Sequence, residues 1–152
     1  MKYYIDCEFD GHRGHLLSLA MVCENGYSIH IGTDVIPKEQ WVIDNVLTII
    51  IDDHCADVDI YSKLNSVGLH IRNFLGNDST PHIIADSPVD IGRFCKAIST
   101  DVDGEWCSTE YQHMTFEVFN VDCYPTTLEG AVKHNAWWDA MALKAKLEGE
   151  GL

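Results

Sequence analysis

The chain has 152 residues, 46% of them hydrophobic, and a formal net charge of −14 from 10 Lys and Arg against 24 Asp and Glu. That length suits one domain with its own core, and the composition is that of a globular rather than a disordered protein. The acidity argues against a basic surface for long nucleic acid and against docking on an anionic membrane. Phosphate chemistry stays open, because divalent metal ions can supply the positive charge that the side chains lack.

No stretch of the sequence reaches the roughly 18 apolar residues of a membrane span. Asp6 and Glu8 stand where a signal peptide would carry its apolar segment, so no signal peptide is expected. The six cysteines form no C-x-x-C pair, and without a secretory signal we expect them to be reduced thiols. These features predict a cytoplasmic protein that does not associate with membranes.

The predicted elements follow from hydrophobic periodicity and turn residues. Strands are expected at 3–9, 16–23, 27–32, 81–85 and 116–121, helices at 37–48, 61–75, 87–98 and 136–147, a loop at 99–115 and a short helical turn at 128–133. Short turns join the first three strands, which predicts an antiparallel meander. The alternating helices and strands that follow predict a single α/β domain over 1–152, with a mixed sheet of about five strands flanked by helices.

The first predicted strand carries a pair of carboxylates. Asp6 and Glu8 are two residues apart, so both side chains leave the same face of the strand, roughly 6–7 Å apart along the chain. Two carboxylates at this spacing can share one metal ion or hold two ions side by side, as two-metal phosphoryl chemistry requires. The alternative is a solvated acidic face, and a D-x-E pattern alone does not decide between them.

A second polar motif, His-Asn-Ala-Trp-Trp-Asp-Ala, opens the last predicted helix. Residues five apart on one helix differ by about 140° in direction, so His134 and Asp139 can face one site only if His134 precedes the helix. Asn135 is then the N-cap. The alternatives are an Asp139 placed near the helix N-terminus by the helix dipole, and a His134 in an exposed loop.

These two motifs, in this order and across nearly the whole chain, resemble those of the DEDD exonucleases of the ribonuclease-H-like fold. The resemblance is to the branch with a catalytic histidine, which includes RNase T, oligoribonuclease and the proofreading subunits of DNA polymerases. The D-x-E motif is matched at 6–8 and the H-x-A-x-x-D-A motif, without a gap, at 134–140. The short length is most similar to small bacterial and phage 3′-to-5′ exoribonucleases. The resemblance implies a ribonuclease-H-like fold and exonuclease activity on single-stranded 3′ ends, of RNA rather than DNA.

The middle motif of the family ends in an Asp early in a helix. Aligned in this way, Asp90 takes the metal-site position and Asp86 replaces a common Asn, with Asp86 as the alternative third carboxylate. A structural interpretation of Asp90 also exists, because Ser87 and Asp90 have the spacing of a capping box.

The mechanism that the resemblance implies is two-metal phosphodiester hydrolysis. Asp6, Glu8 and Asp139 would hold one Mg²⁺ or Mn²⁺ that binds the attacking water. Asp6 would bridge to a second ion over the leaving 3′ oxygen, with Asp90 contacting that ion. His134 would be the general base, a role that suits its near-neutral pKa. The products would be nucleoside 5′-monophosphates.

The resemblance also implies that the residues after the first motif border the terminal nucleotide. His12 or Arg13 could contact its phosphate or sugar, and Phe9 and Leu16 could pack on its base, although a polar turn and core packing are the ordinary alternatives. Many relatives form dimers, so a homodimer is a further expectation.

Two tryptophans and three cations complete the sequence picture. We expect one of Trp137 and Trp138 in the core and the other in contact with a base or a second subunit. Arg93, Lys96 and Lys133 are scattered, and no basic patch is visible. A DNA exonuclease of the same fold and a catalytically idle acidic module that binds a partner protein remain the alternative functions.

Overall fold

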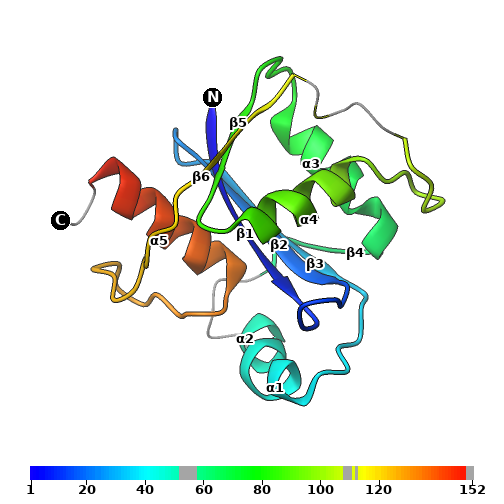
Figure 1. The fold of residues 1–152 in the computed structure, drawn as a ribbon, viewed down its shortest axis with the longest axis horizontal. Coiled ribbons are helices and arrows are strands. Elements are labelled where there is room, and N and C mark those ends of the chain that lie inside the picture. The colour runs from blue at the N-terminus through cyan, green and yellow to red at the C-terminus, as the bar shows by residue number, and fades with distance from the viewer. Residues whose placement is uncertain (52–57, 108–110, 112, 150–152) are drawn as a thin grey trace.

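The structure is a computed structural model, and it describes residues 1–51, 58–107, 111 and 113–149. The strands are β1 (Lys2–Phe9), β2 (Leu16–Cys23), β3 (Ser28–Thr33), β4 (Ile60–Ser62), β5 (His82–Ala85) and β6 (Thr115–Val118). The helices are α1 (Gln40–Val42), the π-helix η1 (Ile43–Leu47), α2 (Thr48–Ile51), the 3-10 helix η2 (Leu64–Ser66), α3 (Val67–Leu75), α4 (Pro88–Ile98) and α5 (Ala136–Glu148). The fold is α/β, with helices flanking a mixed sheet (Figure 1).

The sheet has six strands in the order β4-β3-β2-β1-β5-β6. The first three form the expected antiparallel meander, and β4, β5 and β6 each join it in parallel. The register of β1 against β2 shifts between Glu8 and Phe9, where a bulge follows the second carboxylate. The pairing of β1 with β2 holds Asp6 and Glu8 opposite Ala20 and Ser18, whereas the parallel pairing of β1 with β5 covers only residues 2–4.

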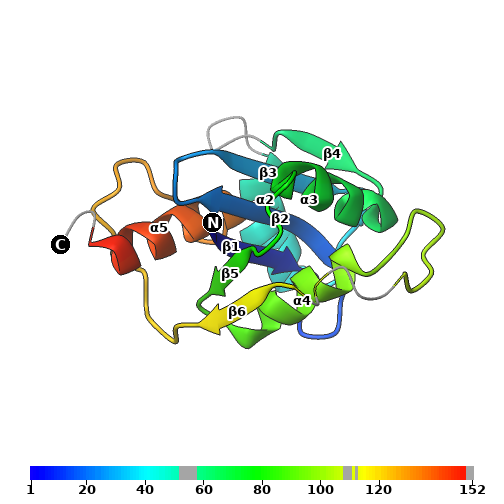
Figure 2. The same ribbon diagram turned by 90° about the horizontal axis from the view of Figure 1, so that it is seen from above.

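The two faces of the sheet have separate cores. Tyr3, Ile5 and Cys7 of β1 pack with α3 and α4 on one face. Tyr4 packs against Leu143 of α5 on the other face. In Figure 2, α3 and α4 lie in front of the sheet, while α5 and α2 lie behind it. The alternation along β1 therefore sends its two acids to the side of α5.

The predicted count of five strands is wrong by one. The additional strand, β4, lies at the start of the segment that we predicted to be a helix over 61–75, and the helix α3 begins only at Val67. The cause is pairing with β3: Asp59 donates its N–H to the carbonyl of His30 (2.8 Å) and accepts the N–H of His30 on its carboxylate (2.7 Å). These tertiary hydrogen bonds hold 60–62 extended despite its helix-like apolar spacing.

Other predicted elements differ mainly in their bounds. The helix expected at 37–48 begins at Gln40 and continues through a π-helical turn to Ile51. None of the helices in the described ranges is long and apolar enough to cross a membrane. Five of the six cysteines lie in the described ranges and are free thiols, and Cys55 lies outside them.

Candidate metal centre

The acidic residues singled out in the sequence meet at one edge of the sheet. Asp6 and Glu8 stand near the carboxyl end of β1, and Asp86 directly follows the neighbouring parallel strand β5. Asp90 lies in the first turn of α4 and Asp139 in the first turn of α5. Ligand sites of α/β proteins commonly lie at the carboxyl ends of parallel strands, next to helix N-termini. The fold therefore places five carboxylates at such an edge.

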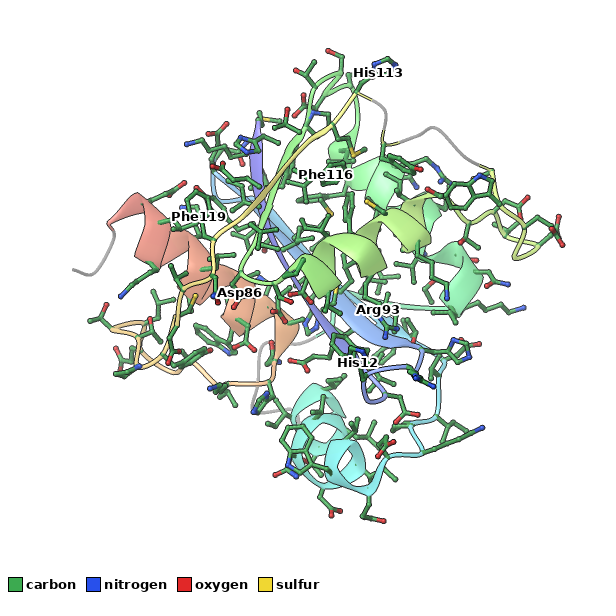
Figure 3. All side chains as sticks on the ribbon, viewed as in Figure 1. His12, Asp86, Arg93, His113, Phe116 and Phe119 are labelled. Carbon is green, nitrogen blue, oxygen red and sulfur yellow. The ribbon has the colours of Figure 1, made fainter. Side chains whose placement is uncertain are left out.

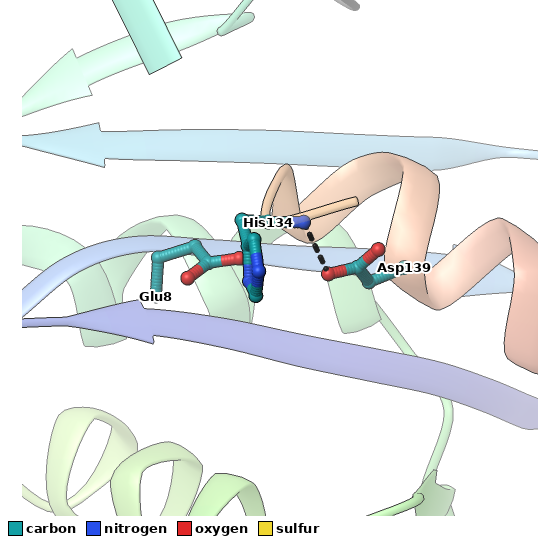
Figure 4. A group of neighbouring side chains, drawn as sticks. All are labelled: Glu8, His134 and Asp139. Atoms are coloured by element: carbon teal, nitrogen blue, oxygen red, sulfur yellow. Dashed lines mark hydrogen bonds between the residues drawn. The ribbon is translucent and has the colours of Figure 1, made fainter. Parts of the chain in front are cut away.

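One ligand group combines the two sequence motifs. A carboxylate oxygen of Glu8, a ring nitrogen of His134 and a carboxylate oxygen of Asp139 all lie within 4.8 Å of one another. Figure 4 shows the three side chains converging between β1 and the start of α5. Glu8 is 9% exposed, whereas His134 and Asp139 are half-buried, so the group is partly open to solvent.

The local geometry of 134–139 explains how His134 and Asp139 reach the same site. Asn135 caps α5, because its side chain accepts the N–H groups of Trp137 (3.1 Å) and Trp138 (3.2 Å). His134 lies just before the helix in a left-handed conformation (φ 66°), which turns it back toward the helix. Its N–H donates to the Asp139 carboxylate (3.0 Å; Figure 4). The prediction that His134 precedes the helix and that Asn135 caps it is confirmed.

A second ligand group contains the middle carboxylates. Oxygens of Asp6, Asp86 and Asp90 lie within 4.8 Å of one another. The sequence offered Asp86 and Asp90 as alternatives, and the structure brings both to the site. Ser87 does cap α4, since its hydroxyl accepts the N–H of Val89 (3.1 Å). The Asp90 side chain, at 4% exposed, instead turns toward β1 and Asp86.

Burial and mutual repulsion raise the pKa of these acids. Burial is the largest cause for Asp6, and the charge of Glu8 follows; together they raise the pKa of Asp6 well above its ordinary range. Burial, then the charges of Asp139 and Asp90, raise the pKa of Glu8 to about 8. Burial, then the charge of Asp86, raise the pKa of Asp90 to about 7. The pKa of Asp139 rises to about 6, again through burial first. At neutral pH the metal-free site therefore carries fewer negative charges than its five carboxylates suggest.

The site fits hard divalent cations. Among the described residues the ion pairs join Met1 to Asp78, His82 to Glu117 and Lys144 to Glu148, and none includes an acid of the site. Carboxylate oxygens are the ligands that Mg²⁺ and Mn²⁺ prefer, and two groups of three ligands offer room for two ions. The raised pKa values reflect a deficit of positive charge that such ions would fill.

Two residues of the site had no signal in the sequence. Tyr124, from the irregular segment after β6, donates its hydroxyl to the Asp139 carboxylate (2.7 Å). Trp41, from α1, lies edge-to-face on the ring of His134, with 5.4 Å between ring centroids. Both are far in sequence from the residues they contact, and neither belongs to a recognisable motif. Their positions depend on tertiary packing alone.

Replacing Tyr124 by Phe is expected to weaken metal binding. Its hydroxyl stabilises the charged form of Asp139 and so lowers the pKa of that carboxylate. Without it, Asp139 binds a proton more readily and loses its fixed orientation. Partners that orient metal ligands are worth about 10- to 100-fold in affinity. Mn²⁺ titration of Tyr124→Phe should show a loss of this size, whereas Tyr27→Phe, which alters a side chain that is 75% exposed, should bind as before.

The residues expected to border a terminal nucleotide lie on the β1–β2 connection. His12 and Arg13 are exposed, whereas Leu16 is 5% exposed and belongs to the core. Phe9 is partly buried beneath the guanidinium of Arg93, 4.6 Å from the ring centroid. Arg93 also donates to the carbonyls of Gly14 and His12, so α4 holds this connection in place. Figure 3 shows His12 and Arg93 beside each other, and Asp86 at some distance from both.

The two tryptophans pack together at the start of α5. Their ring centroids are 4.8 Å apart in an edge-to-face arrangement. Trp137 donates its indole N–H to the hydroxyl of Ser28 (2.9 Å) and packs on a small core cluster containing Ala20 and Ala140. Trp137 is therefore partly buried at the edge of this cluster, and Trp138 is half-buried beside it.

No protein-family model matches this chain, and a search of curated proteins returned no match either. Its function is therefore inferred from the residues of the site.

Proposed function

We propose that the protein is a metal-dependent 3′-to-5′ exonuclease that hydrolyses single-stranded RNA from its 3′ end to nucleoside 5′-monophosphates. The observation that carries the proposal is the meeting of the two motifs: Glu8 of D-x-E and both polar ends of H-x-A-x-x-D-A lie within 4.8 Å of one another. A merely solvated acidic strand face would not bring a histidine and a carboxylate from 126 or more residues away to the same point (134 − 8 = 126).

Different carboxylates of the site would bind each of two Mg²⁺ or Mn²⁺ ions. Glu8 and Asp139 would hold one ion, and Asp90 and Asp86 the other, with Asp6 between the two groups. When bound, such ions neutralise the scissile phosphate, lower the pKa of a water and stabilise the leaving oxygen. Glu8 and Asp90 are buried, which strengthens the electrostatic contacts of these two carboxylates with an ion.

His134 acts as the general base. Burial, then the charge of Lys133, lower its pKa, so the ring is neutral at pH 7 and can accept a proton. In the reaction a water oxygen forms a bond to phosphorus while the bond from phosphorus to the 3′ oxygen breaks. His134 takes the proton of the attacking water, and the released 3′ oxygen is protonated by solvent. The left-handed backbone and the contact with Trp41 fix the ring in the site.

The preference for RNA comes from the resemblance to the short exoribonucleases, and DNA is the competing substrate. To distinguish these substrates, the protein is incubated with Mg²⁺ and either a 5′-labelled single-stranded RNA or a DNA of the same sequence. We expect RNA to shorten from its 3′ end by one nucleotide at a time, with nucleoside 5′-monophosphate as the product. Faster shortening of DNA would show that DNA is the preferred substrate, and the proposed hydrolysis from the 3′ end would still hold.

The same assay tests the enzyme against the idle-module alternative. A 3′-phosphorylated RNA serves as the control, because a blocked end should slow a true 3′ exonuclease but not an endonuclease. If the protein neither cleaves RNA or DNA with Mg²⁺ or Mn²⁺ nor binds either ion, the proposal is wrong.

A further inference from the structure

Two neighbouring pockets lie along the exposed side of α4. They are close to the carboxylates of the metal centre but separate from them. One, of about 380 Å³, is lined by His12 and Arg13 of the β1–β2 connection together with residues of α4. The other, of about 180 Å³, continues along α4 to Thr100. Both are lined by His15, Arg93 and Lys96, so the two pockets adjoin, and we call them together the α4 groove.

The α4 groove is basic in a strongly acidic protein. The chain has 24 acidic residues and only 10 Lys and Arg, yet none of the acids among the described residues lines either pocket. Arg13, Arg93 and Lys96 are three of those ten cations, and two histidines stand beside them. These cations are scattered along the sequence, in which no basic patch is visible. The patch joins residues that are some 80 positions apart (93 − 13 = 80) and could not be seen along the chain.

Several acids lie next to the groove in the sequence. Asp90, between the lining residues Val89 and Gly92, is turned toward β1 and Asp86, although the charge of Arg93 still acts on it. Asp10 accepts the backbone N–H groups of Lys38 (2.8 Å) and Glu39 (2.9 Å). Asp101, beyond the far end of α4, accepts the N–H groups of Asp103 (3.0 Å) and Glu105 (2.8 Å). Asp10 and Asp101 keep their charge, but these backbone N–H groups hold their carboxylates in place, and neither residue lines the groove.

The cations of the groove differ in whether other groups of the protein already engage them. Arg93 is engaged with the carbonyls of His12 and Gly14 and lies over Phe9. Arg13 and Lys96 are exposed, and within the described part of the chain neither makes an ion pair or a side-chain hydrogen bond. Arg93 therefore shapes the groove, while Arg13 and Lys96 are available for an anion.

The first groove cation on α4 lies about one helical turn from the metal centre. Asp90 and Arg93 are three residues apart on α4, and Lys96 follows one turn later. At 1.5 Å per residue, Lys96 lies about 9 Å along the helix axis from Asp90. A strand whose terminal phosphodiester sits at the carboxylates can therefore place a phosphate further along its backbone over this helix.

We propose that the α4 groove binds the phosphates of a single-stranded nucleic acid upstream of its 3′ end. The inference rests on the proposed exonuclease function and adds to it the path of the substrate. Lys96 supplies a point charge to a phosphate and Arg13 a second one. Contacts of this kind position a strand without reading its bases, so they act equally on RNA and DNA. They also explain how a protein of net charge −14 holds a polyanion: three of its ten Lys and Arg residues line the path of the strand.

The test measures binding rather than cleavage. Fluorescence anisotropy follows a 5′-labelled single-stranded decamer, as RNA and as DNA, titrated with protein that carries Asp6→Asn to prevent hydrolysis. Adding Lys96→Gln should weaken binding by roughly threefold to tenfold and should reduce the slope of log affinity against log salt by about 0.7. The loss should be the same for both sugars, and Lys96→Arg should restore the affinity. Lys146→Gln, the same charge change on the exposed end of α5, should leave affinity within about twofold.

The outcomes separate the groove from the exonuclease. Equal affinities for Lys96→Gln and Lys146→Gln, or no measurable binding of the decamer, would overturn the groove and leave any exonuclease activity of the unmodified chain standing. A selective loss in Lys96→Gln supports the groove. If that loss came with no nuclease activity in the unmodified chain, the groove would stand as a nucleic-acid surface and the proposed reaction would fail.

Discussion

Asp6→Asn is expected to stabilise the metal-free protein while abolishing its binding of divalent ions. Asp6 is surrounded by the charges of Glu8, Asp90, Asp139 and Asp86, and its pKa is raised well above the ordinary range by burial and by that repulsion. A neutral amide of the same shape removes the repulsion, for a gain of roughly 1–3 kcal/mol in the free energy of unfolding at pH 8. The same change removes a central ligand, so Mg²⁺ and Mn²⁺ should no longer stabilise the protein.

The sign of the pH dependence follows from the raised pKa values. Between about pH 4, where unfolded carboxylates titrate, and pH 8, the folded metal-free site binds more protons than the unfolded chain. The free energy of unfolding must then fall as pH rises, by about 1.4 kcal/mol per pH unit for each extra proton held. The pKa of about 7 for Asp90 and about 8 for Glu8 place the main loss between pH 5 and pH 8.

Urea unfolding at pH 5 to 8, with EDTA or with Mg²⁺, checks these expectations. The unmodified protein with EDTA should lose stability toward pH 8, and saturating Mg²⁺ should reverse the slope, because an ion binds the ionised acids. Asp6→Asn should flatten the slope with EDTA. Asp103→Asn makes the same chemical change at an exposed loop position and should follow the unmodified protein. A metal-free stability that stays constant across this range would mean that the acids do not interact as the structure implies.

Local sequence patterns were enough to predict the residues whose position depends on nearby backbone. The period of two in a strand puts Asp6 and Glu8 on one face, and the cap at Asn135 fixes His134 and Asp139 relative to α5. Both patterns work because the relevant geometry is contained within a few residues.

The residues missed by sequence reasoning are those placed by tertiary contacts. Tyr124 lies in a segment without regular secondary structure, and only the folded chain brings its hydroxyl to Asp139. Residues 61 and 62 of β4 were predicted as the start of a helix, and only their pairing with β3 shows that they are extended. The basic groove is a further case, since Arg13 and Lys96 become neighbours only because α4 packs beside the β1–β2 connection.

His134→Gln is expected to lower the turnover of a 3′-terminal nucleotide by about 10²- to 10⁴-fold, the usual contribution of a positioned general base. The amide keeps much of the volume of the imidazole but cannot accept the proton of the attacking water. With saturating Mg²⁺, the activity of the unmodified enzyme should rise with pH and then reach a plateau. The midpoint of the rise should lie below 6.5, because burial and the charge of Lys133 lower the pKa of His134. The variant should lack this plateau and keep rising with pH as hydroxide replaces the base.

Measuring metal affinity shows whether His134 acts as a general base or as a metal ligand. His134 also lies within 4.8 Å of Glu8 and Asp139, so a direct role in holding an ion would show as weakened Mn²⁺ binding in His134→Gln. Mg²⁺ prefers oxygen ligands, and we expect the variant to bind Mg²⁺ and Mn²⁺ within a fewfold of the unmodified protein. His113→Gln is the matched control: His113 is exposed and lies far from His12 and Asp86 in Figure 3. Loss of metal binding together with turnover would make His134 a ligand, whereas loss of turnover alone, with the altered pH profile, makes it the base.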